Sequence, residues 1–264
     1  MTEGFLYPHF YFYLSIMAGH NKWSKVKHIK ARVDGKRSKM FSKFSHEITI
    51  AARDGGGDPD MNPRLRTAVD AAKSQSMPKD NIERAIKKGT GELGGAAIQE
   101  MVYEGYGPNG IAMLVEVATD NINRSAAETR VLFAKNGGNI ATPGSVNYLF
   151  EKKGEVRIQE HEFSEDELME IALEADAEDC FISEADEQSV FICEGTQLNE
   201  MANSIRKKFP LTGQKIISVA TTPVVIEDIE TAKKALHLYE TLDDYPDTMN
   251  VFTNFELADS VLQE

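Results

Sequence analysis

The spacing of apolar residues changes once along the chain, near Gly91, and this change constrains the fold more than any other feature. Before it, Phe41, Phe44, Ile48 and Ala51 recur at steps of three and four residues, which places them on one face of a helix. After it, β-rich runs and helical patterns alternate through short links. The chain therefore divides into a helical part and a mixed part.

Helix start and stop signals support the helical part. Asn62 directly precedes Pro63, which is the typical order of an N-cap and a first helical residue. Asp80 and Glu83 have the spacing of a capping box, which predicts that Asp80 caps the helix after Pro78. These signals predict a small helical bundle.

The mixed part alternates short strands and helices without long crossovers, which favours α+β units of ferredoxin-like type. We predict strands at 111–118, 146–150, 155–158, 180–183, 189–193, 215–220 and 250–255, and helices at 123–134, 165–175, 198–209 and 229–242. The predicted fold is α+β, with an N-terminal helical bundle domain followed by two ferredoxin-like domains. The predicted domains are residues 17–95, residues 96–160 together with 223–264, and an acidic insertion at 161–222.

Residues 1–16 are rich in aromatics and contain no Lys or Arg, so we expect Met17 to be the natural start.

Charge is distributed unevenly between the two parts. Residues 17–90 contain 17 Lys and Arg against 8 Asp and Glu, whereas residues 91–264 contain 12 against 33. Such an imbalance indicates polyanion binding at one end of a molecule. The acidic remainder repels nucleic acid, so the basic end has to approach its target in a defined orientation.

The densest positive charge lies at residues 20–43, here called the basic segment, where nine Lys and Arg are opposed only by Asp34. Lys and Arg make phosphate contacts that need no sequence readout. Arg64, Arg66 and Lys79 extend this surface if their helices lie alongside. The predicted nucleic-acid-binding residues are Asn21, Lys22, Trp23, Lys25, Lys27, His28, Lys30, Arg32, Lys36, Arg37, Lys39, Lys43, Arg64, Arg66 and Lys79.

Two interpretations of Trp23 remain open. An aromatic ring within a basic run can stack on an exposed base, which contributes about 1–3 kcal/mol where it occurs. The single tryptophan of the chain can equally anchor the helical core.

The candidate motifs for catalysis and cofactor binding lack the sequence context that these functions require. Gly105 to Gly110 spells G-x-G-x-x-G, but it precedes a predicted strand instead of following one, and Pro108 removes a backbone donor. The six histidines lack metal-ligand spacing, no Ser or Cys has the glycines of a nucleophile elbow, and Cys180 and Cys193 fit buried reduced thiols. We expect no enzymatic activity, no cofactor, no metal and no small-molecule substrate.

No stretch approaches the roughly 18 to 20 apolar residues that a membrane span requires. We therefore expect a cytoplasmic protein with no membrane partner.

From Met17 onward the chain resembles the YebC/PmpR family. The resemblance rests on Met17–Trp23, Gly55–Asp60, Asn62–Arg66, Met77–Arg84, Lys87–Gly91, Tyr103–Pro108, Thr119–Asn121, Gly144–Val146 and Asn250–Asn254. It implies three domains, one helical and two α+β. It also implies one of two roles, because family members are described as DNA-binding transcriptional regulators and as ribosomal translation factors, including a mitochondrial activator of cytochrome c oxidase subunit I.

The residues favour the ribosome as partner, since the chain contains no evident groove-reading motif or dimerisation helix. DNA binding at promoters is the alternative. Phosphate contacts do not distinguish DNA from ribosomal RNA.

Overall fold

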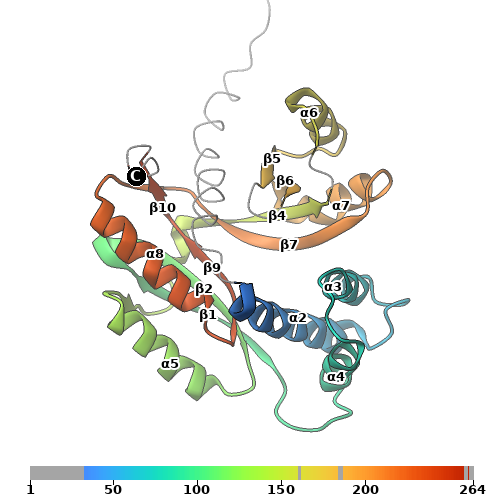
Figure 1. The fold of residues 1–264 in the computed structure, drawn as a ribbon, viewed down its shortest axis with the longest axis horizontal. Coiled ribbons are helices and arrows are strands. Elements are labelled where there is room, and N and C mark those ends of the chain that lie inside the picture. The colour runs from blue at the N-terminus through green and yellow to red at the C-terminus, as the bar shows by residue number, and fades with distance from the viewer. Residues whose placement is uncertain (1–32, 160–161, 184–186, 259–260, 262–264) are drawn as a thin grey trace, which may run out of the picture.

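The computed structural model describes residues 33–159, 162–183, 187–258 and 261, with side chains described from residue 39 onward. Figure 1 shows three units: a bundle of helices, a sheet with two long helices on one face, and a second sheet with two shorter helices. We call them the helical unit, the split unit and the inserted unit. The predicted extension at residues 1–16 lies outside the described residues.

The helical unit contains α2 (Val33–Gly55), α3 (Pro63–Ser74) and α4 (Lys79–Gly89). Its core brings Ile48 of α2 against Leu65 and Val69 of α3 and Ile82 of α4, which confirms the helical periodicity. The Asn62 side chain accepts a hydrogen bond from Leu65 N and so caps α3.

The predicted cap of α4 was wrong. Pro78 occupies the N-cap position without a side-chain hydrogen bond, and Asp80 lies inside the first turn. The fixed φ of proline suits the start of a helix, so α4 begins two residues earlier than a cap at Asp80 would allow. Asp80 still favours the helix, because negative charge is stabilising near an N-terminus.

The split unit is built around a four-stranded antiparallel sheet with strand order β3-β1-β2-β9. The strands are β1 (Gln99–Tyr106), β2 (Ala112–Thr119), β3 (Asn139–Ile140) and β9 (Thr248–Thr253). Helices α5 (Ile122–Lys135) and α8 (Ile229–Asp243) flank it, and a short parallel pair joins β8 (Val224–Ile226) to β10 (Phe255–Leu257). The stretch from Gly105 to Gly110 ends β1 and enters the hairpin loop between β1 and β2, which contains a 3-10 turn at Pro108–Gly110.

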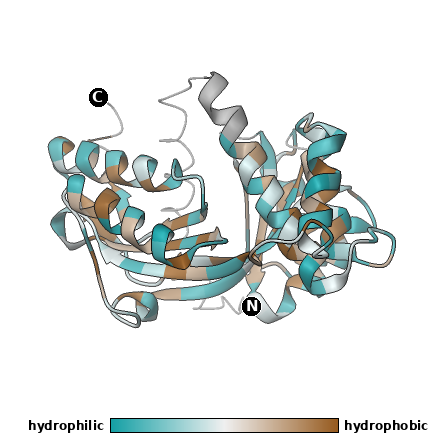
Figure 2. Ribbon diagram, turned by 90° about the horizontal axis from the view of Figure 1, so that it is seen from below, coloured by the Kyte–Doolittle hydropathy of each residue, from teal (hydrophilic) through white to brown (hydrophobic). Residues whose placement is uncertain are grey.

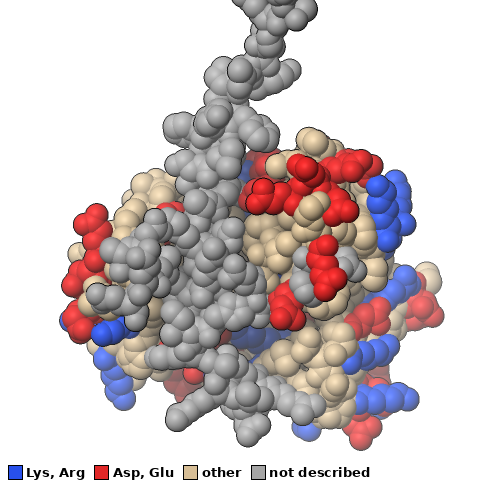
Figure 3. Space-filling model, turned by 45° about the horizontal axis from the view of Figure 1, so that its top comes forward, with Lys and Arg blue, Asp and Glu red and all other residues tan. Residues whose placement is uncertain are grey.

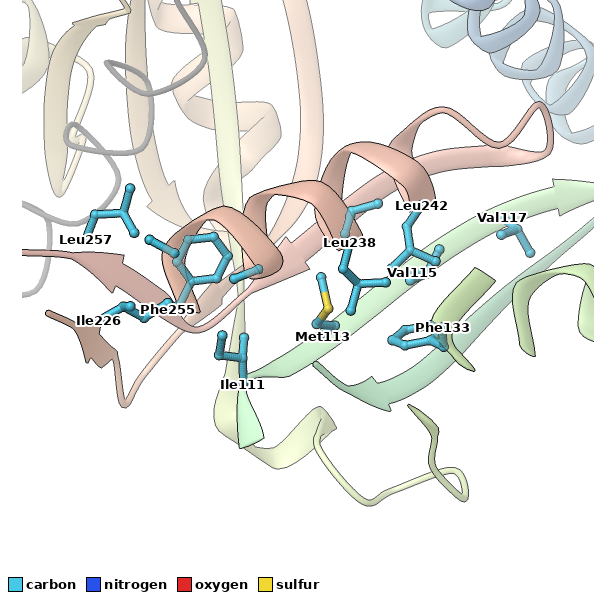
Figure 4. Close-up of a cluster of buried hydrophobic side chains, with 13 residues drawn as sticks. Ile111, Met113, Val115, Val117, Phe133, Ile226, Leu238, Leu242, Phe255 and Leu257 are labelled. Carbon is cyan, nitrogen blue, oxygen red and sulfur yellow. The ribbon is translucent and has the colours of Figure 1, made fainter. Parts of the chain in front are cut away.

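The core of the split unit lies between this sheet and its helices. Figure 4 shows Met113 and Val115 of β2 pointing towards Leu238 and Leu242 of α8, with Phe133 of α5 beside them. All five side chains are almost fully buried. Burial at roughly 25 cal/mol per Å2 makes this cluster a principal source of stability for the unit.

The inserted unit is a second four-stranded antiparallel sheet, with order β5-β6-β4-β7. Its elements are β4 (Phe150–Ile158), α6 (Glu165–Glu174), β5 (Asp179–Ser183), β6 (Gln188–Glu194), α7 (Leu198–Arg206) and β7 (Leu211–Ala220), with 3-10 turns at Asn147–Leu149 and Gly195–Gln197. The chain order is β-α-β-β-α-β, which is the connection of a ferredoxin-like unit.

Two details of the predicted architecture differ from the structure. The split unit starts with a central hairpin, β1-β2, so its connection is not the ferredoxin-like one. The predicted boundary at residue 160 assigned residues 150–158 to the split unit, whereas β4 pairs with β6 and β7 of the inserted unit. The backbone hydrogen bonds along β4 determine the sheet to which this strand belongs. Because its partner strands are distant in the sequence, the residues of β4 alone do not indicate which sheet it joins.

The units contact one another through mixed interfaces. Phe252 of β9 packs against Ile192 and Ile217 of the inserted unit, while Ile50 of α2 packs against Ile98 and Ala118 beside the split sheet. Helix α3 lies against β7. Figure 2 shows hydrophilic and hydrophobic residues alternating around the helices, as expected when each helix buries one face. Within the described ranges, none of the helices has the length and apolar character needed to cross a membrane.

Candidate nucleic-acid interface

Most of the predicted basic segment precedes the residues whose side chains are described. Asn21, Lys22, Trp23, Lys25, Lys27, His28, Lys30 and Arg32 lie outside the described residues. Lys36 and Arg37 belong to α2, but their side chains are not described. The assignment of these ten residues stays a prediction.

Two predicted phosphate partners, Lys39 and Lys43, lie one helical turn apart on α2 and bind carboxylates of the protein itself. Lys43 Nζ is 2.6 Å from Asp243 Oδ1, and Lys39 forms an ion pair with Asp244. Both aspartates lie at the C-terminal end of α8. The described end of the basic segment therefore faces the split unit.

Arg64 and Arg66 start α3 on its exposed side. Arg64 bridges two carboxylates, with Nη1 3.1 Å from Asp54 Oδ2 and Nη2 3.4 Å from Glu47 Oε1. Arg66 instead donates to the backbone carbonyls of Pro59 and Asp60, at 3.0 and 2.7 Å. Arg66 also forms an ion pair with Asp60 at 3.8 Å, so it stabilises the loop between α2 and α3 while about half of its side chain stays exposed.

Lys79 is the most accessible of the predicted residues whose side chains are described, with 86% of its side chain exposed. Its nearest carboxylate is Glu83, one turn further along α4 at 3.5 Å. An exposed pair at this spacing contributes only about 0.3–0.5 kcal/mol, so Lys79 is available to a polyanion.

Two further cations of the helical unit, Arg53 and Lys88, hold this unit on the split unit. Arg53 donates to Ile98 O at 2.7 Å and to Glu100 Oε2 at 3.0 Å, and Lys88 is 3.4 Å from Asp120. The sequence prediction missed both roles. Single basic residues at helix ends carry no local sign of a partner on a distant strand.

A buried polar cluster lies at the same junction around Asp247. Its carboxylate accepts hydrogen bonds from Thr119 Oγ1 at 2.8 Å, Arg124 Nη2 at 2.9 Å and Tyr245 Oη at 3.1 Å. Burial favours the protonated acid, but these hydrogen bonds outweigh it and hold the pKa of Asp247 below its ordinary value. The site is thus a fixed negative charge beside α2.

His46 of α2 is close enough to this cluster to sense Asp247. Burial lowers the pKa of His46, although the neighbouring Asp247 opposes the shift. Its Nδ1 is buried without a hydrogen-bond partner among the described residues. His46 is therefore neutral at pH 7 and serves the junction as a packed side chain.

The exposed surface of the inserted unit has a different character. The first turn of α6 carries Glu165, Asp166 and Glu167, and Ser164 forms a capping box with Glu167. Figure 3 shows Asp and Glu gathered over the upper right part of one face, with Lys and Arg interspersed with further Asp and Glu along the right-hand edge. An acidic surface of this kind repels phosphates.

The described residues offer little to metal or thiol chemistry. Among them, no group of three or more His, Cys, Asp or Glu side chains is arranged to hold a metal ion. Burial raises the pKa of Cys180 and of Cys193 to about 11, so both are protonated thiols. Neither is poised as a nucleophile, because the thiolate is the reactive form.

Comparison with known proteins agrees with this architecture. A family model described as the TACO1/YebC second and third domain matches residues 98–255, and one described as the TACO1/YebC protein N-terminal domain matches residues 21–92. The chain belongs to the TACO1/YebC family. Residues 98–255 contain the split and inserted units up to the start of β10, and residues 21–92 contain the helical unit and most of the basic segment.

Relatives of this TACO1/YebC chain match most of its length. A protein of Akkermansia muciniphila named "Probable transcriptional regulatory protein" is 57% identical over 94% of this chain and 99% of its own. A protein of the same name from Persephonella marina is 44% identical over the same shares. The crystal structure of a conserved hypothetical protein from Aquifex aeolicus superposes with a TM-score of 0.80 at 44% identity, covering 89% of this chain and 96% of that one.

Proposed function

We propose that this chain is a non-catalytic, nucleic-acid-binding regulator of gene expression that acts in the cytoplasm at the ribosome. The observation that carries the proposal is the charge division, with 17 basic against 8 acidic residues in 17–90 and 12 against 33 in 91–264. Binding through phosphates needs such a basic end and no base-reading element. The sequence contains no evident groove-reading motif or dimerisation helix, so ribosomal RNA is the partner we favour.

The exposed cations of α3 and α4 support this proposal. Arg64, Arg66 and Lys79 belong to the same unit as the basic segment, and each keeps about half or more of its side chain exposed. The acidic inserted unit turns the molecule so that only this end approaches RNA.

The test is sedimentation of cell lysate through sucrose gradients at low and moderate salt. We expect salt-sensitive comigration with ribosomes, lost when Lys25, Lys27 and Lys30 are replaced by Glu. A matched control replaces the exposed Lys207, Lys233 and Lys234 by Glu and keeps comigration. Wild-type protein found only at the top of the gradient contradicts the ribosomal proposal.

The second candidate function is DNA binding at promoters. The relatives' name, "Probable transcriptional regulatory protein", favours it, as does the four-residue link between α3 and α4, which has the length of a helix-turn-helix turn. The first turn of α4 carries Asp80 beside Lys79, which weakens phosphate contacts there. Labelled promoter fragments that bind no better than scrambled ones would remove this candidate.

A further inference from the structure

The contact between α2 and α8 joins residues that lie two hundred positions apart in the sequence. Lys43 Nζ is 2.6 Å from Asp243 Oδ1, and Lys39 pairs with Asp244. Lys39 and Lys43 are separated by one helical turn, while their two carboxylate partners are consecutive residues. The pairs hold the N-terminal half of α2 against the end of α8.

The carboxylates occupy an unfavourable place on their own helix. Asp243 is the last residue of α8 and Asp244 is its C-cap, and the last turn contains no basic residue. The C-terminal end of a helix carries partial negative charge, so acidic side chains there destabilise the helix. Cations from α2 offset this repulsion. The two lysines of α2 therefore explain how α8 can end in two aspartates.

We propose that Lys39 and Lys43 form a site for two neighbouring phosphates of a nucleic-acid backbone, and that Asp243 and Asp244 occupy this site in the free protein. The inference rests on the proposed function. Carboxylate and phosphate oxygens both accept hydrogen bonds from ammonium groups, so the two aspartates stand where phosphates bind. Nucleic acid then binds at the site by displacing the end of α8.

Displacement is feasible because all four side chains of the ion pairs are partly exposed to water. The side chains of Lys39 and Asp244 are 32% and 55% exposed, and those of Lys43 and Asp243 are 29% and 30% exposed. Ion pairs this close to solvent contribute little to stability. The helical unit keeps its other contacts with the split unit, through Arg53 and through Ile50, when these pairs open.

Zero-length carbodiimide crosslinking of the full chain tests occupancy directly. It joins an ammonium to a carboxylate only where the two are in contact. We expect peptides joined through Lys43–Asp243 and Lys39–Asp244 in the free protein, and their loss as a 20-nucleotide poly(U) RNA saturates it. Crosslinks that persist at saturation would overturn the inference.

A variant in which both aspartates are neutralised tests whether they compete with nucleic acid for Lys39 and Lys43. Asp243→Asn with Asp244→Asn should bind the same poly(U) about five-fold or more tightly at low salt, because typical coupling between two sites lies in this range. The control, Glu227→Gln with Glu230→Gln, changes the net charge equally at the other, exposed end of α8. Equal affinities of variant and control overturn the inference.

The two proposals fail separately. If the wild-type chain binds neither RNA nor DNA, the proposed function fails. If it binds, and binding weakens on replacing Lys25, Lys27 and Lys30 by Glu but does not respond to Asp243 and Asp244, only the occupancy of the α2 site fails.

Discussion

Single polar residues hold the loops of this protein in place. The Asn62 side chain caps α3 and also donates to Ala51 O at 2.7 Å and Gly56 O at 2.9 Å, so one buried amide closes the whole link between α2 and α3. Glu104 does the same for the loop after β3. Its carboxylate accepts from the backbone N–H groups of Gly144, Val146 and Asn147 at 2.6, 2.7 and 3.0 Å.

We expect Asn62→Ala to lower the free energy of unfolding by about 2–3 kcal/mol, since it removes a helix cap and leaves two buried carbonyls without their donor. Denaturant unfolding followed by circular dichroism measures the change. Lys73→Ala, on the exposed face of α3, serves as control and should change stability by less than about 0.5 kcal/mol. Equal effects of the two substitutions would contradict the role of Asn62.

Glu104 predicts a pH dependence. Burial favours its protonated form, but the backbone hydrogen bonds prevail and lower the pKa below 4.5. A carboxyl with a lowered folded-state pKa stabilises the protein above its unfolded pKa, and this contribution is lost as pH falls through the folded value. The stability difference between wild type and Glu104→Gln should thus be constant near neutral pH and shrink below about pH 4.5. A pH-independent difference in denaturant unfolding would contradict this account.

At the scale of elements, α2 is the helix that joins the helical unit to the split unit. Its contacts there are one apolar cluster around Ile50, the ion pairs of Lys39, Lys43 and Arg53, and the packed side chain of His46. Most of this junction is polar. Its strength should therefore depend on solution conditions more than the strength of the sheet cores does.

His46 makes this dependence measurable. Its lowered pKa means that the unfolded chain binds a proton below about pH 6.5 while the folded chain resists it, so stability falls as the pH drops. His46→Gln should reduce the loss of stability between pH 7.5 and 5.5. Hydrogen exchange of α2 amides at the two pH values, corrected for intrinsic rates, measures this loss of stability. An unchanged pH response in His46→Gln would show that His46 does not cause the loss of stability at low pH.

At the scale of the whole molecule, the two sheets meet through few apolar side chains. Phe252 of β9 contacts both the cluster around Val146 and Leu114 and the cluster around Ile192 and Ile217. Lys152 adds a polar link, with Nζ 3.2 Å from Glu116 Oε1. Phe252 is therefore one of the side chains that fix the relative position of the split and inserted units.

Phe252→Ala should loosen the inserted unit while leaving each sheet folded. We expect a loss of about 1–3 kcal/mol, below the range for fully buried Phe because this ring is only half-buried. Limited proteolysis at the link between β7 and β8 should accelerate. Tyr148→Ala, at an exposed ring, is the control and should leave the cleavage rate unchanged. Equal cleavage of both variants would show that Phe252 does not hold the units together.

The amino-acid sequence by itself determined the elements whose signals are local. Apolar spacing and the Asn62-Pro63 pair were sufficient for α2 and α3, and the acidic run at 165–175 was sufficient for α6, because caps and one-sided burial act within a few turns. The charge division between the two parts is likewise a property of the sequence alone.

Only the tertiary structure decided which distant segments meet. Gln99–Tyr106 mixes polar and apolar residues too irregularly to predict β1, and its place is set by pairing with β2 and β3. The sheet to which β4 belongs, and the pairing of Lys39 and Lys43 with Asp243 and Asp244, depend on contacts between residues far apart in the chain. Such contacts form only when distant segments of the chain are brought together, so no local sequence pattern predicts them.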